Sequence, residues 1–146
     1  MELEAFEILL VDDDDVDIEG VIRGLKKHDI RNKVTVARDG IEALEILRGE
    51  GESKKLPWPN LVLLDLKMPR MDGLECLEEI RKDPTLHNTI VFVLTTSANE
   101  SDKLKADKLN VSGYLVKSEV GDGFEKLVDM LEGFWDIVRN PSVQPS

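Results

Sequence analysis

The chain has 146 residues, 41% of them hydrophobic, which is enough to bury the core of one compact domain. Its formal net charge of -11 argues against nonspecific nucleic-acid binding, which needs a positive surface, and against docking on anionic lipid. The single cysteine excludes an internal disulfide framework, and no apolar run approaches the roughly 20 residues of a membrane span. We therefore expect a cytoplasmic protein with neither a nucleic-acid nor a membrane partner.

Short apolar runs alternate with amphipathic stretches along the chain. The runs are rich in Val, Leu and Ile and are expected as strands at 7–11, 33–37, 61–64, 90–94 and 113–116. Helical patterns follow them near 15–28, 40–50, 72–82, 99–108 and 120–138. This fivefold alternation predicts an α/β fold in which helices cover both faces of a parallel sheet. We expect one domain over residues 1–140 and a short polar tail over 141–146.

Polar and charged side chains follow the apolar runs. In a parallel α/β sheet, ligands bind at the carboxyl ends of the strands. The residues expected at those ends are Asp12, Asp13, Asp65, Thr95, Thr96, Ser97 and Lys117. Two carboxylates about 4 Å apart repel by about 4 kcal/mol at an effective dielectric near 20. A bound Mg²⁺ would remove that cost while using only one or two of them as ligands.

Such a set could move a phosphoryl group onto a carboxylate, a reaction that depends on positioning and charge neutralisation. Asp65 would be the nucleophile, and a metal on Asp12 and Asp13 would hold one phosphoryl oxygen. Lys117 and Thr95 would hold the others.

Ordinary roles remain open for single members of the set. Acidic residues at strand ends also cap helices, and Asp14 or Asp15 is expected to cap the first helix. Asp65 taken alone could be an ordinary loop acid. The joint placement of acids, hydroxyls and a lysine at successive strand ends favours the phosphoryl site.

Four segments resemble a known family. They are ILLVDDD at 8–14, LVLLDLKMPRMDG at 61–73, VLTTSA at 93–98 and GYLVKS at 113–118. Over residues 6–138 the chain resembles the receiver domain of two-component response regulators. The resemblance implies a flavodoxin-like, doubly wound sheet of five parallel strands in the order 2-1-3-4-5, the order that receiver proteins exemplify.

The resemblance also implies which residues bind the phosphoryl group and the metal. Asp65 would be the phosphoacceptor. Asp12, Asp13, Asp65 and the backbone carbonyl of Lys67 would bind Mg²⁺. The side chain of Lys67 would then be free to tune the phosphoryl lifetime.

The remaining implied roles concern signalling. Thr95 and Lys117 would contact the phosphoryl group, and Tyr114 would turn inward as Thr95 moves. Ser97 and Thr96 would tune the lifetime through water access. The donor would be a sensor histidine kinase and the output a downstream protein target. The protein would therefore be a switch that assists its own phosphorylation and dephosphorylation, rather than an enzyme.

Two positions depart from the family pattern. Ser118 stands where a proline, often cis, usually follows the lysine, and Thr96 replaces a more common alanine. Together with a long last helix, these features resemble the stand-alone subgroup that includes cyanobacterial phytochrome response regulators. A phytochrome-like kinase is accordingly the expected donor.

The extended C-terminal helix carries an apolar stripe at helical spacing. Its members are Phe124, Leu127, Val128, Leu131, Phe134, Trp135 and Val138. The favoured interpretation is packing on the protein's own sheet. The alternative is a surface for a homodimer or another partner.

Three other functions compete with the receiver interpretation. A phosphatase or phosphotransferase with an aspartyl-phosphate intermediate commonly has a second Asp two residues after the nucleophile, where this chain has Lys67. A scaffold that signals without phosphate would not require the intact set of acids, Thr95 and Lys117. A flavin carrier would need a phosphate-cradling glycine loop after the first strand, and none is present there.

Overall fold

The computed structural model describes residues 6–51, 55–57, 60–117 and 125–138. Its elements alternate as β1 (Glu7–Val11), α1 (Asp15–Lys27), β2 (Val34–Ala37), α2 (Gly40–Arg48), β3 (Asn60–Leu64), α3 (Gly73–Lys82), β4 (Val91–Thr95), α4 (Glu100–Lys108), β5 (Gly113–Val116) and α5 (Glu125–Val138). The five strands are parallel and lie in the order β2-β1-β3-β4-β5. The predicted flavodoxin-like fold and strand order are therefore confirmed, in a single domain.

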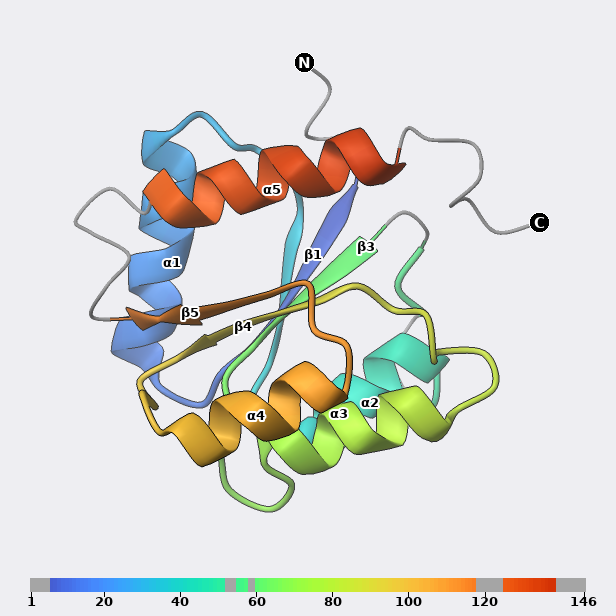
Figure 1. The fold of residues 1–146 in the computed structure, drawn as a ribbon. Coiled ribbons are helices and arrows are strands. Elements are labelled where there is room, and N and C mark those ends of the chain that lie inside the picture. The colour runs from blue at the N-terminus through green and yellow to red at the C-terminus, as the bar shows by residue number, and fades with distance from the viewer. Residues whose placement is uncertain (1–5, 52–54, 58–59, 118–124, 139–146) are drawn as a thin grey trace.

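Helices cover both faces of the sheet, as Figure 1 shows, with α1 and α5 on one side and α2, α3 and α4 on the other. The period of two along β1 fits this arrangement. Ile8 and Leu10 pack in the core beneath α1 and α5, whereas Leu9 and Val11 pack in the core beneath α2 and α3. The central strands are buried on both faces, which explains their nearly continuous apolar sequences.

The first four helices, α1 to α4, begin at the carboxyl edge of the sheet with side-chain caps. Asp14 caps α1 by accepting the Asp17 N–H, so the expectation of a cap at Asp14 or Asp15 is confirmed at Asp14. Asp39 caps α2, Asp72 forms a capping box with Glu75 at α3, and Asn99 caps α4. These caps stabilise the loops that connect the ends of the strands to the helices α1 to α4.

The apolar stripe of α5 packs on the protein's own sheet, as the favoured interpretation predicted. Its buried members are Leu127, Val128, Leu131, Phe134 and Trp135. Phe6 contacts Phe134 edge to face at 4.7 Å between ring centroids and stacks on Trp135 at 5.7 Å. Phe124, Ser118 and the side chain of Val138 lie outside the described residues. Among the described helices, none is long and apolar enough to cross a membrane.

Candidate functional site

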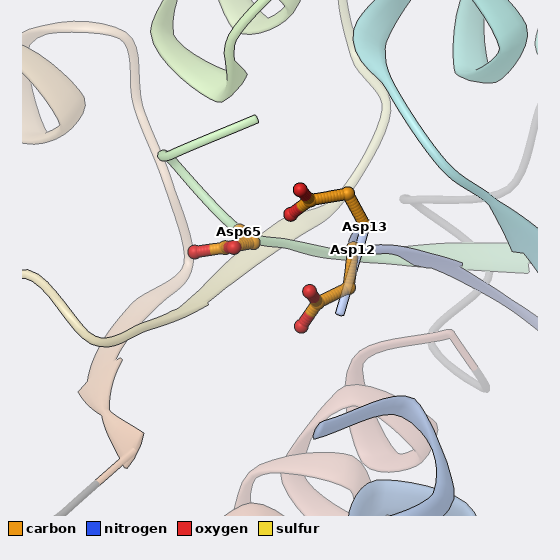
Figure 2. Close-up of side chains that lie close together, drawn as sticks. All are labelled: Asp12, Asp13 and Asp65. Atoms are coloured by element: carbon orange, nitrogen blue, oxygen red, sulfur yellow. The ribbon is translucent and has the colours of Figure 1, made fainter. Parts of the chain in front are cut away.

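The carboxyl edge of the sheet brings the predicted acids together. Asp12 directly follows β1 and Asp65 directly follows β3, and the two strands pair in register up to Val11 and Leu64. The Asp65 N–H donates to the Val11 carbonyl at 2.9 Å, which continues the ladder into the site. Figure 2 shows the side chains of Asp12, Asp13 and Asp65 gathered around this edge. One carboxylate oxygen from each lies within 4.8 Å of the others.

Burial of Asp65 makes this cluster electrostatically costly. Asp12 is 1% exposed and Asp65 is 5% exposed, while Asp13 is open to solvent. Burial raises the pKa of Asp65 and the Asp12 charge adds to the rise, whereas Lys117, the Thr95 hydroxyl and the Lys67 N–H oppose it. Asp65 Oδ1 is buried without a hydrogen-bond partner among the described residues.

These residues fit a hard divalent cation. Such ions take carboxylate oxygens as ligands, and the three acids each offer one oxygen within 4.8 Å of the others. The unpartnered Asp65 oxygen is a group that costs about 1–3 kcal/mol when buried without a partner. A cation held by Asp12, Asp13 and Asp65 would offset both that cost and the repulsion between the acids.

Lys117 lies immediately after β5 and reaches across to the acids. Its ammonium donates to Asp12 Oδ2 at 2.5 Å and to Asp17 Oδ2 at 2.8 Å, and lies 3.8 Å from Asp65 Oδ2. Burial of the ammonium lowers the Lys117 pKa, but the bonds to the carboxylates outweigh it and the net pKa is raised. Lys117 is therefore a firmly charged cation beside the candidate nucleophile.

Thr95 and Ser97 link the site to its surroundings. Thr95 ends β4, is fully buried, and its hydroxyl accepts the Ser97 N–H at 3.2 Å. The Ser97 carbonyl accepts the Tyr114 hydroxyl at 2.9 Å. Thr96 is exposed. Tyr114 is thus bonded to the backbone two residues after Thr95.

Lys67 points its ammonium toward α4. It lies 3.1 Å from Asp102 Oδ2, and the same carboxylate accepts the Ser97 hydroxyl at 2.7 Å. These bonds, that from Ser97 first, hold the Asp102 pKa below its usual value. Lys67 and Ser97 therefore both bind the buried side chain of Asp102 in α4.

Asp17 and Asp102 were not predicted from the sequence. Both lie on helices, in α1 and α4, and not directly after a strand. The signal that could have found Asp17 is its place in the first turn after the acidic run. Asp102 carries no such signal, because its contact with Lys67 joins segments that only the fold brings together.

Together these residues could supply a nucleophilic carboxylate, ligands for a cation and contacts to a phosphoryl group. Asp65 Oδ1 accepts no hydrogen bond from any of the described residues, and Lys117 supplies positive charge 3.8 Å from Asp65 Oδ2. Thr95 adds a hydroxyl. This set suits the transfer of an anionic group to a carboxylate, in which developing charge must be neutralised.

Comparisons with known proteins show the family of the chain. The family described as response regulator receiver domain matches residues 8–132. The response regulator Rcp1 of Synechocystis sp. (strain ATCC 27184 / PCC 6803 / Kazusa) is 42% identical over 128 residues, covering 88% of this chain and 87% of Rcp1. The probable methanogenesis regulatory protein FilR2 of Methanothrix harundinacea (strain 6Ac) is 33% identical over 133 residues, covering 90% and 84%.

Solved structures of related regulators have the same fold. The Mn(2+)-bound form of Rcp1 is 43% identical with a TM-score of 0.75, covering 88% of this chain and 92% of that one. The phosphorylated cyanobacterial phytochrome response regulator RcpA is 37% identical with a TM-score of 0.75, covering 96% and 98%. The chain therefore belongs to the response regulator receiver domain family.

Proposed function

We propose that the protein is a single-domain response regulator, spanning residues 1–140, that accepts a phosphoryl group on Asp65. The observation that carries the proposal is the environment of the Asp65 carboxylate. It is 5% exposed, has one oxygen without a hydrogen-bond partner among the described residues, and lies within reach of Lys117 and the other two acids. The fold therefore buries the Asp65 carboxylate and leaves its Oδ1 able to bind a phosphoryl group or a cation.

In the proposed reaction, an Asp65 oxygen attacks the phosphorus of a phosphohistidine. The phosphorus–nitrogen bond breaks, and the kinase imidazole leaves with its electron pair and takes up a proton. The product is an acyl phosphate on Asp65. Lys117 neutralises a phosphoryl oxygen with little reorganisation, because its ammonium already lies 3.8 Å from Asp65 Oδ2. Thr95 turns and donates its hydroxyl to another phosphoryl oxygen.

A divalent cation, Mg²⁺ in our proposal, would be held by Asp12, Asp13, Asp65 and the Lys67 carbonyl, and supplies charge neutralisation when bound. Support comes from the donor set and from the Mn(2+)-bound form of a relative. Asp13 is the exposed member of the cluster, which leaves that side open to ion exchange with solvent.

The signal would leave through the Thr95–Ser97–Tyr114 connection. If Thr95 turns to the phosphoryl group, the Ser97 N–H loses its acceptor and the Ser97 peptide can shift. That shift would break or redirect the bond from Tyr114 to the Ser97 carbonyl. The surface around Tyr114 would then differ between the two states, as a downstream protein target requires. Thr96, Ser97 and Lys67 would tune the phosphoryl lifetime.

The donor we propose is a sensor histidine kinase, of the phytochrome type by analogy with relatives named as phytochrome response regulators. We place the protein in the cytoplasm, where its free, buried cysteine fits a reducing environment. A homodimer through α5 stays a proposal. It would have to use the exposed side of that helix, because Phe134 and Trp135 are buried against the sheet.

The test is a phosphorylation assay read by the mass of the intact protein. Wild type and Asp65→Asn are incubated with acetyl phosphate and Mg²⁺. We expect one added phosphoryl group on wild type, none on Asp65→Asn, and none on wild type in a metal chelator. Asp129→Asn, an exposed acid on α5, is the matched control and should label like wild type. Equal labelling of Asp65→Asn would refute the proposal.

A further inference from the structure

Lys117 binds two carboxylates, and one of them, that of Asp17, does not come from the end of a strand. Besides the 2.5 Å bond to Asp12, its ammonium donates to Asp17 Oδ2 at 2.8 Å. Asp17 lies in the first turn of α1, so this bond joins the residue after β5 to a helix. A lysine ammonium has three donors. Two of them are engaged, which leaves one for Asp65, 3.8 Å away.

The position of Asp17 is fixed by its own backbone. Its N–H donates to the Asp14 carboxylate at 3.0 Å, the cap that begins α1. The Asp17 side chain is 34% exposed and that of Lys117 is 12% exposed. Asp17 therefore reaches from the rim of the site to a cation that is mostly withdrawn from water.

Asp12 and Asp17 differ in what else they bind. Asp12 Oδ1 accepts the Asp14 N–H, Oδ2 accepts Lys117, and Asp12 also belongs to the cluster that fits a divalent cation. A cation at that cluster would compete with Lys117 for Asp12. Asp17 lies outside the cluster found among the described residues, so its bond to Lys117 can persist in the metal-loaded protein.

We propose that Asp17 is a positioning residue for phosphorylation of Asp65, acting through Lys117. It holds the ammonium so that its remaining N–H faces Asp65, where the phosphoryl group would be attached. This inference rests on the proposed function, because it assigns Asp17 a part in the same reaction. Without Asp17, Lys117 has one anchor in the metal-free protein and a weaker one when Asp12 binds metal. The ammonium would then sample positions that do not face the phosphoryl group.

The first test compares two substitutions in the same helical turn. Asp17→Asn removes the charge that touches Lys117, whereas Asp15→Asn removes a charge whose partner is Arg38, at 2.6 Å on the surface. At saturating Mg²⁺, we expect Asp17→Asn to lower the rate constant for labelling by acetyl phosphate about three- to tenfold. Asp15→Asn should stay within about twofold of wild type. Equal rates for all three proteins would overturn the inference while leaving the phosphoacceptor role of Asp65 intact.

A double-mutant cycle separates positioning from a structural role. If Asp17 acts through Lys117, Asp17→Asn has no further effect in a Lys117→Met background. If Asp17 only maintains α1, the same fold-loss appears in both backgrounds, and the inference fails. Asp17→Glu, which keeps the charge on a longer arm, should recover part of the lost rate.

A second readout needs neither metal nor phosphoryl group. In the metal-free protein labelled with nitrogen-15, the Lys117 ammonium should give a proton–nitrogen correlation that is protected from rapid exchange with water. We expect that signal in wild type and Asp15→Asn and its loss in Asp17→Asn. A signal that persists in Asp17→Asn would show that Asp12 holds Lys117 alone. Failure of wild type to label at all would refute the proposed function, yet this measurement would still decide whether Asp17 anchors Lys117.

Discussion

At the scale of single residues, the proposed phosphoacceptor Asp65 depends on a close approach of two backbone segments. Gly73 is the first residue of α3, and its N–H donates to the Leu66 carbonyl at 3.1 Å. A Cβ on Gly73 would lie 2.2 Å from the Asp65 carbonyl oxygen and 2.7 Å from the Leu66 Cα. The glycine of the Asp72-Gly73 pair is therefore required by space immediately behind Asp65.

Gly73→Ala should distort the segment that carries Asp65. The contacted atoms are backbone and cannot rotate away, so we expect a loss of about 1–3 kcal/mol in the free energy of unfolding, the usual range for overpacking. Urea unfolding followed by circular dichroism measures it. Gly20→Ala is the matched control, because a Cβ on Gly20, within α1, meets nothing within 4 Å. That variant should gain up to about 1 kcal/mol from helix propensity. Similar stabilities for the two variants would contradict the steric argument.

At the scale of elements, the helices are attached to the sheet in different ways. α5 buries a broad apolar stripe, including Phe134 against Phe6. α4 buries only Asp102 and Ala106, and its Leu104 is 61% exposed. The Asp102 carboxylate, bonded to Ser97 and Lys67, therefore replaces much of the apolar contact that other helices make. α4 is held by polar bonds from Asp102 to Ser97, two residues after Thr95, and to Lys67.

Asp102→Ala should loosen α4 selectively. Loss of two charge-assisted bonds leaves Ala106 as the remaining buried anchor, so amide hydrogen exchange within α4 should quicken about tenfold or more. Exchange in α5 should change little. Asp107→Ala, an exposed position in the same helix, is the control and should leave α4 exchange near that of wild type. Uniform acceleration across all helices in Asp102→Ala would show that the effect is global and not confined to α4.

At the scale of the whole molecule, the topology makes the site, and this explains what the sequence could predict. The short apolar runs located every strand to within a residue or so. In β1, β3 and β4 these runs are nearly continuous because both faces of the strand are buried. Asp12, Asp65, Thr95 and Lys117 were predictable because parallel strands end at one edge. The bonds of Lys117 to Asp17 and of Lys67 to Asp102 were not predictable, because they depend on how α1 and α4 pack beside the sheet.

The same topology collects buried negative charge at one edge, and this has a consequence for stability against pH. Asp65 has a raised pKa in the folded protein, with burial as the largest cause. The folded state therefore binds a proton more readily than the unfolded chain. Protonation of Asp65 therefore stabilises the folded state. This stabilisation is fully present below the pKa of Asp65 in the unfolded chain and is lost as the pH rises through the pKa of Asp65 in the folded protein. At neutral pH and without metal, the charged Asp65 destabilises the fold.

Asp65→Asn should therefore raise the free energy of unfolding of the metal-free protein at pH 7. The gain should shrink as the pH falls through the folded pKa of Asp65, because the wild-type carboxyl is then neutral as well. Urea unfolding in a chelator, at a series of pH values between 7 and 4, measures both effects. A variant less stable than wild type at pH 7 would mean that the Lys117 contact outweighs the cost of burial.

Asp83→Asn gives a control of opposite sign. The Thr85 N–H, the Thr85 hydroxyl and Arg48 lower the pKa of Asp83 to about 2. Its contribution is present above the unfolded pKa of 3.8 and is lost as the pH falls toward 2. Asp83→Asn should therefore be less stable than wild type at pH 7. Because the two substitutions remove the same charge, opposite signs at pH 7 would show that local surroundings outweigh the net charge of -11 in setting stability.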